Sequence, residues 1–445
     1  MNRPTTMPGD PIQDAIATGR LPAAVRLLHA ALTGAPDDAR LHARLGQVLL
    51  LADRRDAAGE PLRRAAALAP GDWHCQVMLA RYLDQMRLQD GAADAYRRAL
   101  AIRPGDVDSR YRLGCVLRRN GNLDAAAIVF RELLAQLPGD AQALHELGLM
   151  HWQRDELDPA ERHFSAALER HPDNPYFRCT LASVRAEAEA ARAPRKPGAP
   201  RVVVHVNKWF HFPILLPIFE QLRGEHHVRI TGELELVRNF RPDVVVCSDL
   251  QGRRLRALLP QAKMVYVRHG LTSKNHLPDA GNACDFLAGI TSEYMASQLV
   301  TNYGLRREQI WVTGHVLLDP LFRVTVPPAP VTLKPGRKTI LFAPTWNRHL
   351  SAADLMRQRT VELLRGDGDA NVIIKPHPHT EQLRPDWMQA LRTAARAHPD
   401  VWLVEDPAAD VVPLLGAVDV LVSDVSSVLF SWLALDRPMV LVTHP

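Results

Sequence analysis

The side chains best suited to bind a phosphate lie in one turn near the end of the chain. Residues 420–422 form an apolar run typical of a buried parallel strand, and the apolar-periodic run from Val428 predicts the helix that follows. Asp424, Ser426 and Ser427 stand between them. Open α/β sheets bind ligands at such turns, because N–H groups at a helix start attract an anion and hydroxyls add donors. Phosphate binding and simple helix capping by Asp424 or Ser426 both remain open on these residues alone.

Three other turns carry polar residues after predicted strands, and they could complete such a site. These turns are Arg268-His269-Gly270, residues 343–348 with Thr345 and Trp346, and residues 375–379 with Lys375 and His377. The carboxyl ends of parallel strands meet at one edge of a sheet, where open α/β folds bind their ligands. Four polar turns at such ends therefore favour a ligand site over four ordinary connections.

The C-terminal half alternates short β-branched runs with amphipathic stretches, which predicts parallel sheets. Strands are expected at residues 202–206, 244–247, 264–267, 286–290 and 310–313, and again at 339–342, 372–374, 401–404, 420–422 and 439–442. The Pro-rich segment 324–330 separates the two series. Two successive βα series predict an α/β fold of two Rossmann-like lobes, residues 201–325 and 338–445, with the ligand in the cleft between them.

The N-terminal half repeats every 34 residues. A leucine column is followed by a small-residue column, and every unit closes on a proline: Leu45, Leu79, Leu113, Leu147 and Leu181; Gly46, Ala80, Gly114, Gly148 and Ala182; Pro36, Pro70, Pro104, Pro138 and Pro172. Small residues let two helices approach closely, and the proline ends the second helix. The pattern resembles the tetratricopeptide repeat over about residues 5–186. It implies an α superhelical array, residues 1–190, whose concave face binds a peptide, a polymer or a protein partner.

A Pro- and Gly-rich segment follows the array. It covers residues 193–200, so a linker and a domain boundary are expected within residues 191–200. Few contacts need to cross such a linker. The part of the chain from about residue 199 onward should therefore bind its ligand without the array.

The motifs of the C-terminal half resemble the bacterial CDP-glycerol glycerophosphotransferases of teichoic acid and capsule synthesis. The resemblance spans residues 201–445 and is carried by His269-Gly270 with Lys274, Thr313-Gly314 with Asp319, residues 343–346, residues 375–378 and residues 423–430. It implies a glycosyltransferase-B fold and the transfer of a polyol phosphate or glycosyl group from a nucleotide-activated donor, such as CDP-glycerol, to a polymeric or lipid-linked hydroxyl acceptor. The chain departs from the family at residues 315–318 and 347–348 and ends just after a strand, so we expect a truncated C-terminal lobe.

The resemblance also implies roles for the candidate residues. His269 is the expected catalytic base, since a hydroxyl is a poor nucleophile and histidine has a suitable pKa, although it could instead hold its loop. The residues expected to bind substrate and nucleotide are Gly270, Thr345, Trp346, Lys375, His377, Asp424, Ser426 and Ser427. Lys375 and the serine hydroxyls would stabilise the charge of the leaving nucleotide, while Trp346 would line the base pocket or pack in the core.

We expect no metal and no other cofactor. The sequence has no D-x-D pair, and His377 and His379 lack a third ligand at a persuasive spacing. The five cysteines are odd in number and never stand in C-x-x-C spacing, which argues against a zinc site and against a disulfide framework.

Composition indicates a globular protein of the cytoplasm. Hydrophobic residues make up 47% and charged residues 23% of the chain, and no segment approaches the run of about 20 apolar residues that a membrane span needs. The net charge of +5 suits anionic substrates or a peripheral position at the inner face of the plasma membrane. No basic run is interleaved with aromatics, so nucleic acid is not an expected partner.

Three other interpretations stay open. Residues 312–319 are also similar to UDP-N-acetylglucosamine 2-epimerases, although Ser427-Val428 replaces the Gly-Gly expected there. Repeats before a glycosyltransferase-B domain also occur in protein O-GlcNAc transferases, whose motifs this chain does not match. The third interpretation is a repeat scaffold with a degenerate, non-catalytic transferase domain.

Overall fold

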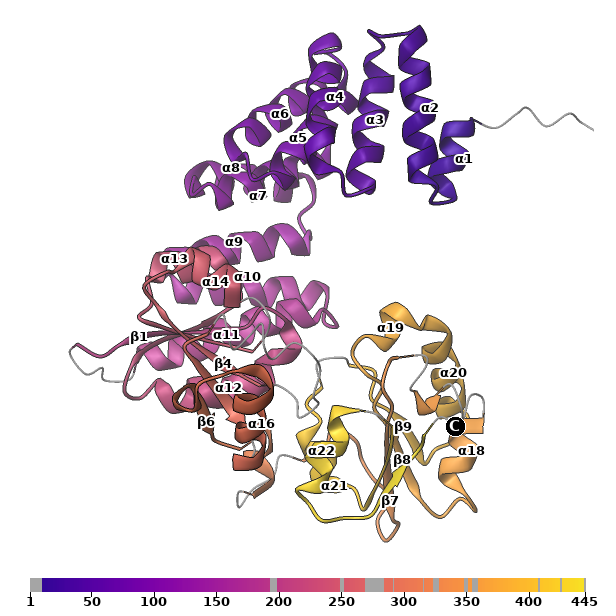
Figure 1. The fold of residues 1–445 in the computed structure, drawn as a ribbon. Coiled ribbons are helices and arrows are strands. Elements are labelled where there is room, and N and C mark those ends of the chain that lie inside the picture. The colour runs from indigo at the N-terminus through magenta and orange to yellow at the C-terminus, as the bar shows by residue number, and fades with distance from the viewer. Residues whose placement is uncertain are drawn as a thin grey trace, which may run out of the picture. The chain divides into compact units, whose positions relative to one another are not determined.

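The computed structural model describes residues 10–192, 198–248, 252–268, 284–290, 292–314, 316–322, 328–347, 351–353, 359–406, 409–424 and 426–443. The chain forms two compact units, Met1–His171 and Pro172–Pro445 (Figure 1). Each unit is described by itself below. Within the described ranges, no helix is long and apolar enough to cross a membrane.

The first unit is the predicted array of paired helices. Its described helices are α1 (Pro11–Ala17), α2 (Leu21–Gly34), α3 (Ala39–Leu51), α4 (Arg55–Leu68), α5 (Trp73–Gln85), α6 (Gln89–Ile102), α7 (Val107–Arg119), α8 (Leu123–Gln136), α9 (Ala141–Gln153) and α10 (Leu157–Arg170). Helices that follow one another in the sequence lie side by side, as Figure 1 shows for α1 to α4. The helical repeat fold expected from the 34-residue period is confirmed.

The small-residue column lies where one helix of a pair meets the next. A Cβ added at Gly46 would stand 2.3 Å from Cγ of Leu62, and one at Gly114 would stand 2.6 Å from Cζ of Phe130. Such distances are far inside van der Waals contact, so a larger residue at either position would force the neighbouring side chain to shift. The column therefore sets how closely the paired helices pack.

A second column of residues, not expected from the sequence, caps the start of the first helix in each 34-residue repeat. Its members precede α3, α5, α7, α9 and α11 (Pro175–Ala191), and they are Asp38, Asp72, Asp106, Asp140 and Asn174. Each side chain accepts a hydrogen bond from a backbone N–H of the first turn of its helix. Such N-caps satisfy N–H groups that have no partner within the helix, and each is worth about 1 kcal/mol.

The second unit contains a six-stranded parallel sheet in the order β2-β1-β3-β4-β5-β6. Its strands are β1 (Arg201–His205), β2 (His227–Thr231), β3 (Val244–Cys247), β4 (Lys263–Val267), β5 (Phe286–Ile290) and β6 (Ile310–Val312). One face packs against α13 (Leu234–Phe240), α14 (Gly252–Leu258) and α16 (Glu293–Tyr303), and the other against α11 and α12 (Phe212–Leu222). The five strands expected here are confirmed. β2 was not among the expected strands; it is a short edge strand in which polar and apolar residues alternate.

The second sheet of this unit is five-stranded and parallel, in the order β11-β10-β7-β8-β9. Its strands are β7 (Thr339–Ala343), β8 (Asn371–Ile374), β9 (Val401–Leu403), β10 (Val420–Ser423) and β11 (Met439–Leu441). One face packs against α18 (Thr360–Arg365) and α20 (Pro385–Arg396), and the other against α21 (Val412–Ala417), α22 (Ser427–Leu433) and Leu318 of η3 (Val316–Phe322), as Figure 1 shows for the four α-helices. This confirms the second predicted series of strands. Leu318 was expected in the first lobe, but its apolar side chain packs into the core of the second.

Helix α11 belongs to the second unit, although it continues the repeat register. Ala186 and Ala190 pack with Ile230 in the core of the first sheet. Oε1 of the buried Glu187 accepts the N–H of Ile230 at 2.9 Å, and Oε2 lies 3.3 Å from Nε of Arg229. Because β2 is an edge strand, this helix covers backbone groups that would otherwise be open to pairing. The compact units therefore divide before α11, whereas the sequence analysis expected the boundary at residues 191–200.

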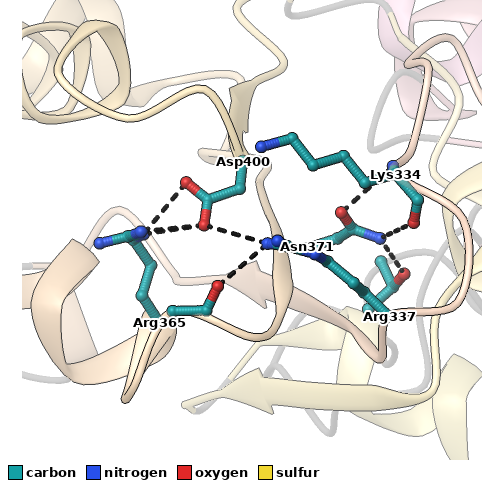
Figure 2. Close-up of polar contacts among 7 residues, drawn as sticks. Lys334, Arg337, Arg365, Asn371 and Asp400 are labelled. Carbon is teal, nitrogen blue, oxygen red and sulfur yellow. Dashed lines mark hydrogen bonds and ion pairs between the residues drawn. The ribbon is translucent and has the colours of Figure 1, made fainter.

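A polar network braces the amino ends of the second sheet (Figure 2). The buried carboxylate of Asp400, just before β9, accepts hydrogen bonds of 3.0 to 3.1 Å from Arg365, and Arg337 lies 3.7 Å away. Asn371, at the start of β8, donates to the carbonyl of Lys334 at 2.9 Å and accepts its N–H at 3.2 Å. These contacts lie at the sheet edge opposite the polar turns, so their role is to hold the strands together.

Candidate functional site

The turn after β10 is organised by Asp424, which is completely buried. Its carboxylate accepts the backbone N–H of Thr345 at 2.8 and 3.0 Å and the N–H of Ala352 at 2.7 Å. In addition, the hydroxyl of Ser423 donates to the carbonyl of Ala343 at 2.6 Å. Asp424 therefore binds the backbone of the turn after β7, and it sets the position of Thr345.

Ser426 is the N-cap of α22. Its hydroxyl oxygen accepts the N–H of Val428 at 3.5 Å, and its own N–H donates to the carbonyl of Asp424 at 2.7 Å. The capping interpretation left open by the sequence is thus observed for Ser426. A serine hydroxyl that accepts in a cap still carries one proton to donate, so capping and phosphate binding are compatible. Ser427 follows as the first residue of the helix.

Lys375 follows β8 at the same edge of the sheet and is 8% exposed. Its Nζ donates to the carbonyl of Asp406 at 3.3 Å and to that of Pro376 at 3.4 Å. Burial lowers the pKa of this lysine to about 8, and the nearby Asp406 carboxylate opposes that shift. The carbonyls that bind Nζ are neutral, so they do not cancel the positive charge of the ammonium. Such a charge is suited to bind an incoming phosphate.

Imidazole and indole rings gather around the same turns. The ring of Trp346 lies 6.3 Å from that of His377 and 6.1 Å from that of His379, and the two imidazoles are 5.3 Å apart. Nδ1 of His377 accepts the backbone N–H of His379 at 3.1 Å. This bond requires an unprotonated Nδ1, so in the neutral ring Nε2 carries the proton and can donate. Trp346 is half-buried.

The first lobe contributes Phe210 to this cluster. Phe210 lies in η1 (Trp209–His211), after β1, and its ring meets that of His379 at 5.8 Å in an edge-to-face contact. Nζ of Lys208 stands 5.5 Å from the Phe210 ring. Residues from both predicted lobes therefore meet at the carboxyl ends of their strands.

The structure joins Thr345 and Ser426 to Asp424, and Trp346 to His377. Lys375 lies at the carboxyl end of β8, where its Nζ binds the carbonyl of Asp406. His269 and Gly270 lie outside the described residues. No group of three or more His, Cys, Asp or Glu residues in the described part of the chain is arranged to hold a metal ion.

Sequence reasoning missed Asp406 and Phe210. Asp406 follows the strand expected at residues 401–404, so the rule that selected the other four turns applies to it as well. Phe210 stands in an aromatic run directly after the first strand of its lobe. The hydrogen bond from the Ala352 N–H to the Asp424 carboxylate had no signal in the sequence, because the two residues are far apart in the chain.

Comparisons with known proteins agree with these two units. Residues 261–444 match the family described as CDP-Glycerol:Poly(glycerophosphate) glycerophosphotransferase. Residues 12–72, 77–141 and 111–175 match the tetratricopeptide repeat. No curated protein matches the chain.

Several solved structures match the array. A MamA protein is 23% identical, covers 36% of this chain and 88% of its own, and has a TM-score of 0.35. YrrB, described as a TPR protein with an unusual peptide-binding site, is 21% identical, covers 37% of this chain and 84% of its own, and has a TM-score of 0.35. MamA from Desulfovibrio magneticus RS-1 is 22% identical, covers 34% and 86%, and has a TM-score of 0.32. The family matches by themselves indicate tetratricopeptide repeats within residues 12–175 and a glycerophosphotransferase-type domain over residues 261–444.

Proposed function

We propose that the second unit transfers a polyol phosphate, such as glycerol phosphate, from a CDP-activated donor to a hydroxyl of a cell-surface polymer or its lipid-linked precursor. The acceptor oxygen attacks the β-phosphorus of the donor, the bond from that phosphorus to the bridging oxygen breaks, and CMP leaves. The hydroxyl proton passes to the proposed base, His269. The family match supports this reaction class.

The observation that carries the proposal is the buried ammonium of Lys375 at the sheet edge that also holds Ser426 and His377. A diphosphate placed there would receive the lysine charge, the serine O–H and the Nε2–H of His377. All three donors oppose the negative charge that develops on the leaving nucleotide. Asp424 contributes indirectly, since it holds the backbone of Thr345 in place.

The remaining candidate residues suit the nucleobase of the donor and the acceptor. A half-buried indole such as that of Trp346 can stack on a nucleobase while it stays packed on one side. Gly270, beside the proposed base, would allow the acceptor to approach closely. The array would bind the acceptor or a protein partner on its concave face, and the enzyme would work in the cytoplasm at the inner face of the membrane.

The test is a calorimetric titration of the full chain with CDP, CMP, UDP and UDP-sugars. We expect cytidine nucleotides to bind most tightly, and Lys375→Ala to weaken CDP binding by about 1 to 3 kcal/mol, the cost of losing hydrogen bonds to a charged group. His269→Ala should leave that affinity nearly unchanged and lower turnover by about 10² to 10⁴. A preference for uridine nucleotides, or unchanged CDP binding by the Lys375 variant, would refute the proposed donor or site.

A further inference from the structure

An arginine of helix α11 reaches the turn after β9 of the second sheet. Arg178 lies in the first turn of this helix, and its Nη1 forms an ion pair with the carboxylate of Asp406. Its Nη2 donates to the carbonyl of Pro172 at 3.1 Å. The two paired side chains are 39% and 36% exposed, so solvent screens the pair and its own contribution to stability is small.

Asp406 faces the arginine and the buried lysine with different groups. Its side chain binds Arg178, while its main-chain carbonyl accepts the hydrogen bond from Nζ of Lys375 at 3.3 Å. One residue thus joins a guanidinium on the helix to an ammonium at the strand end. The two cations come from segments almost two hundred residues apart in the chain.

Helix α11 is a firm support for Arg178. Asn174 caps its first turn, and further along the helix Glu187 binds the edge strand of the first sheet. Ala186 and Ala190 are buried against the same sheet. The C-terminal half of the helix is therefore held on the first lobe, and the guanidinium projects from the capped first turn of the same helix.

We propose that Arg178 is a positioning residue for Lys375 that acts through Asp406, so that the last helix in the repeat register sets the lysine that binds the donor's diphosphate. This inference rests on the proposed function of Lys375. Two effects follow from the contacts. The guanidinium orients Asp406 so that its carbonyl receives Lys375, and it neutralises a carboxylate that would otherwise pair with the ammonium and repel a phosphate.

Titration of CDP against pH tests this role in the full chain. At pH 7.5 Arg178→Ala should bind CDP about two- to fivefold more weakly, the range for a solvent-screened pair, and Arg178→Lys should recover most of the loss. The alkaline midpoint of binding should also move to higher pH in Arg178→Ala, because the released carboxylate favours the charged lysine. A merely structural role would weaken binding at every pH without moving this midpoint.

Arg392 supplies the matched control. Its guanidinium binds Glu405, the residue before Asp406, at 2.7 Å, and it also binds Glu381. Arg392→Ala removes two surface ion pairs, one of them to the residue before Asp406, and we expect its CDP affinity and alkaline midpoint to equal those of the unchanged protein.

A double-mutant cycle with Asp406→Asn tests whether Arg178 acts on Lys375 through the Asp406 carboxylate. This variant keeps the carbonyl that binds Lys375 and removes the carboxylate, so Arg178→Ala should have no further effect in its background. The role of Arg178 would be overturned if Arg178→Ala had an equal effect in both backgrounds. It would also be overturned if Arg178→Ala left binding and midpoint unchanged while Lys375→Ala lost CDP binding. Either result would leave the proposed function standing. Unchanged binding by Lys375→Ala would instead overturn the proposed function with it. Circular dichroism of each variant shows whether its fold is intact. If Arg178→Ala does not fold, the variants Asp406→Asn and Arg178→Lys are compared in its place.

Discussion

At the scale of single residues, Lys375 is held in an unfavourable position for a charged group. Burial lowers its pKa to about 8, and the nearby Asp406 carboxylate offsets only part of that shift. A residue that lowers stability in a strand-end turn is typical of binding sites, where a charge must be ready before the ligand arrives. The same burial ties CDP binding to pH.

We predict that CDP affinity is level between pH 6.5 and 7.5 and falls as the pH rises through about 8, the pKa of Lys375. Only the protonated lysine attracts the diphosphate, so above this pKa the affinity should fall by about tenfold per pH unit. Calorimetric titrations of the full chain from pH 6.5 to 9.5 measure it.

The control for this profile is Lys375→Arg. A guanidinium stays charged across the whole range, so the alkaline decline should disappear even if the affinity itself changes. A level profile in the unchanged protein, or the same decline in the arginine variant, would show that another group controls binding.

At the scale of elements, the array depends on columns of residues that recur in every unit. Gly114 meets the ring of Phe130 inside one helix pair, and Gly148 meets that of Phe164 in the next. Aspartates and an asparagine cap the helices at the same period. Packing and capping thus recur together from one 34-residue repeat to the next.

Gly114→Ala tests the packing column. The added methyl group would stand 2.6 Å from Cζ of Phe130, so the ring must shift, and we expect a loss of about 1 to 3 kcal/mol in the free energy of unfolding. Urea unfolding followed by circular dichroism measures it. Gly105→Ala, in a turn where nothing lies within 4 Å of the added group, should stay within about 0.5 kcal/mol of the unchanged protein. Equal losses in both variants would mean that the column does not determine the packing.

At the scale of the whole molecule, α11 is the element that matters most for dividing the chain. It has the cap and the leucine of the repeat register, Asn174 and Leu181, yet it covers a face of the first sheet together with α12. Removing the array at residue 199 would strip a helix from the transferase unit and expose Ile230. A chain expected to bind nucleotide by itself should therefore begin before α11, and not at residue 199.

We predict that a chain beginning at Pro172 folds and binds CDP, whereas one beginning at Ala199 is less stable by about 3 kcal/mol or more. The loss combines the hydrogen bond from Ile230 to the Glu187 carboxylate with the apolar surface that α11 buries. Thermal unfolding and CDP titration of both chains measure the difference. Matching stabilities would show that α11 is dispensable to the lobe.

Local pattern alone determined the helical array, the two series of strands and the turns at which polar residues gather. The 34-residue period and the apolar runs record which side chains are buried, and burial repeats with the geometry of the element that carries it. The positions of Thr345, Lys375, His377 and Ser426 at strand ends followed from the same patterns. These features depend on neighbours within one or two elements, so the sequence displays them directly.

Only the tertiary structure decided which groups meet across the chain. It turned Asp424 toward the backbone of Thr345 and Ala352, and it packed α11 against the first sheet. It also joined Arg178 to Asp406, 228 residues later. Such contacts depend on how whole elements pack, and a carboxylate or an arginine has the same local signature whether it faces solvent, a ligand or a distant backbone N–H.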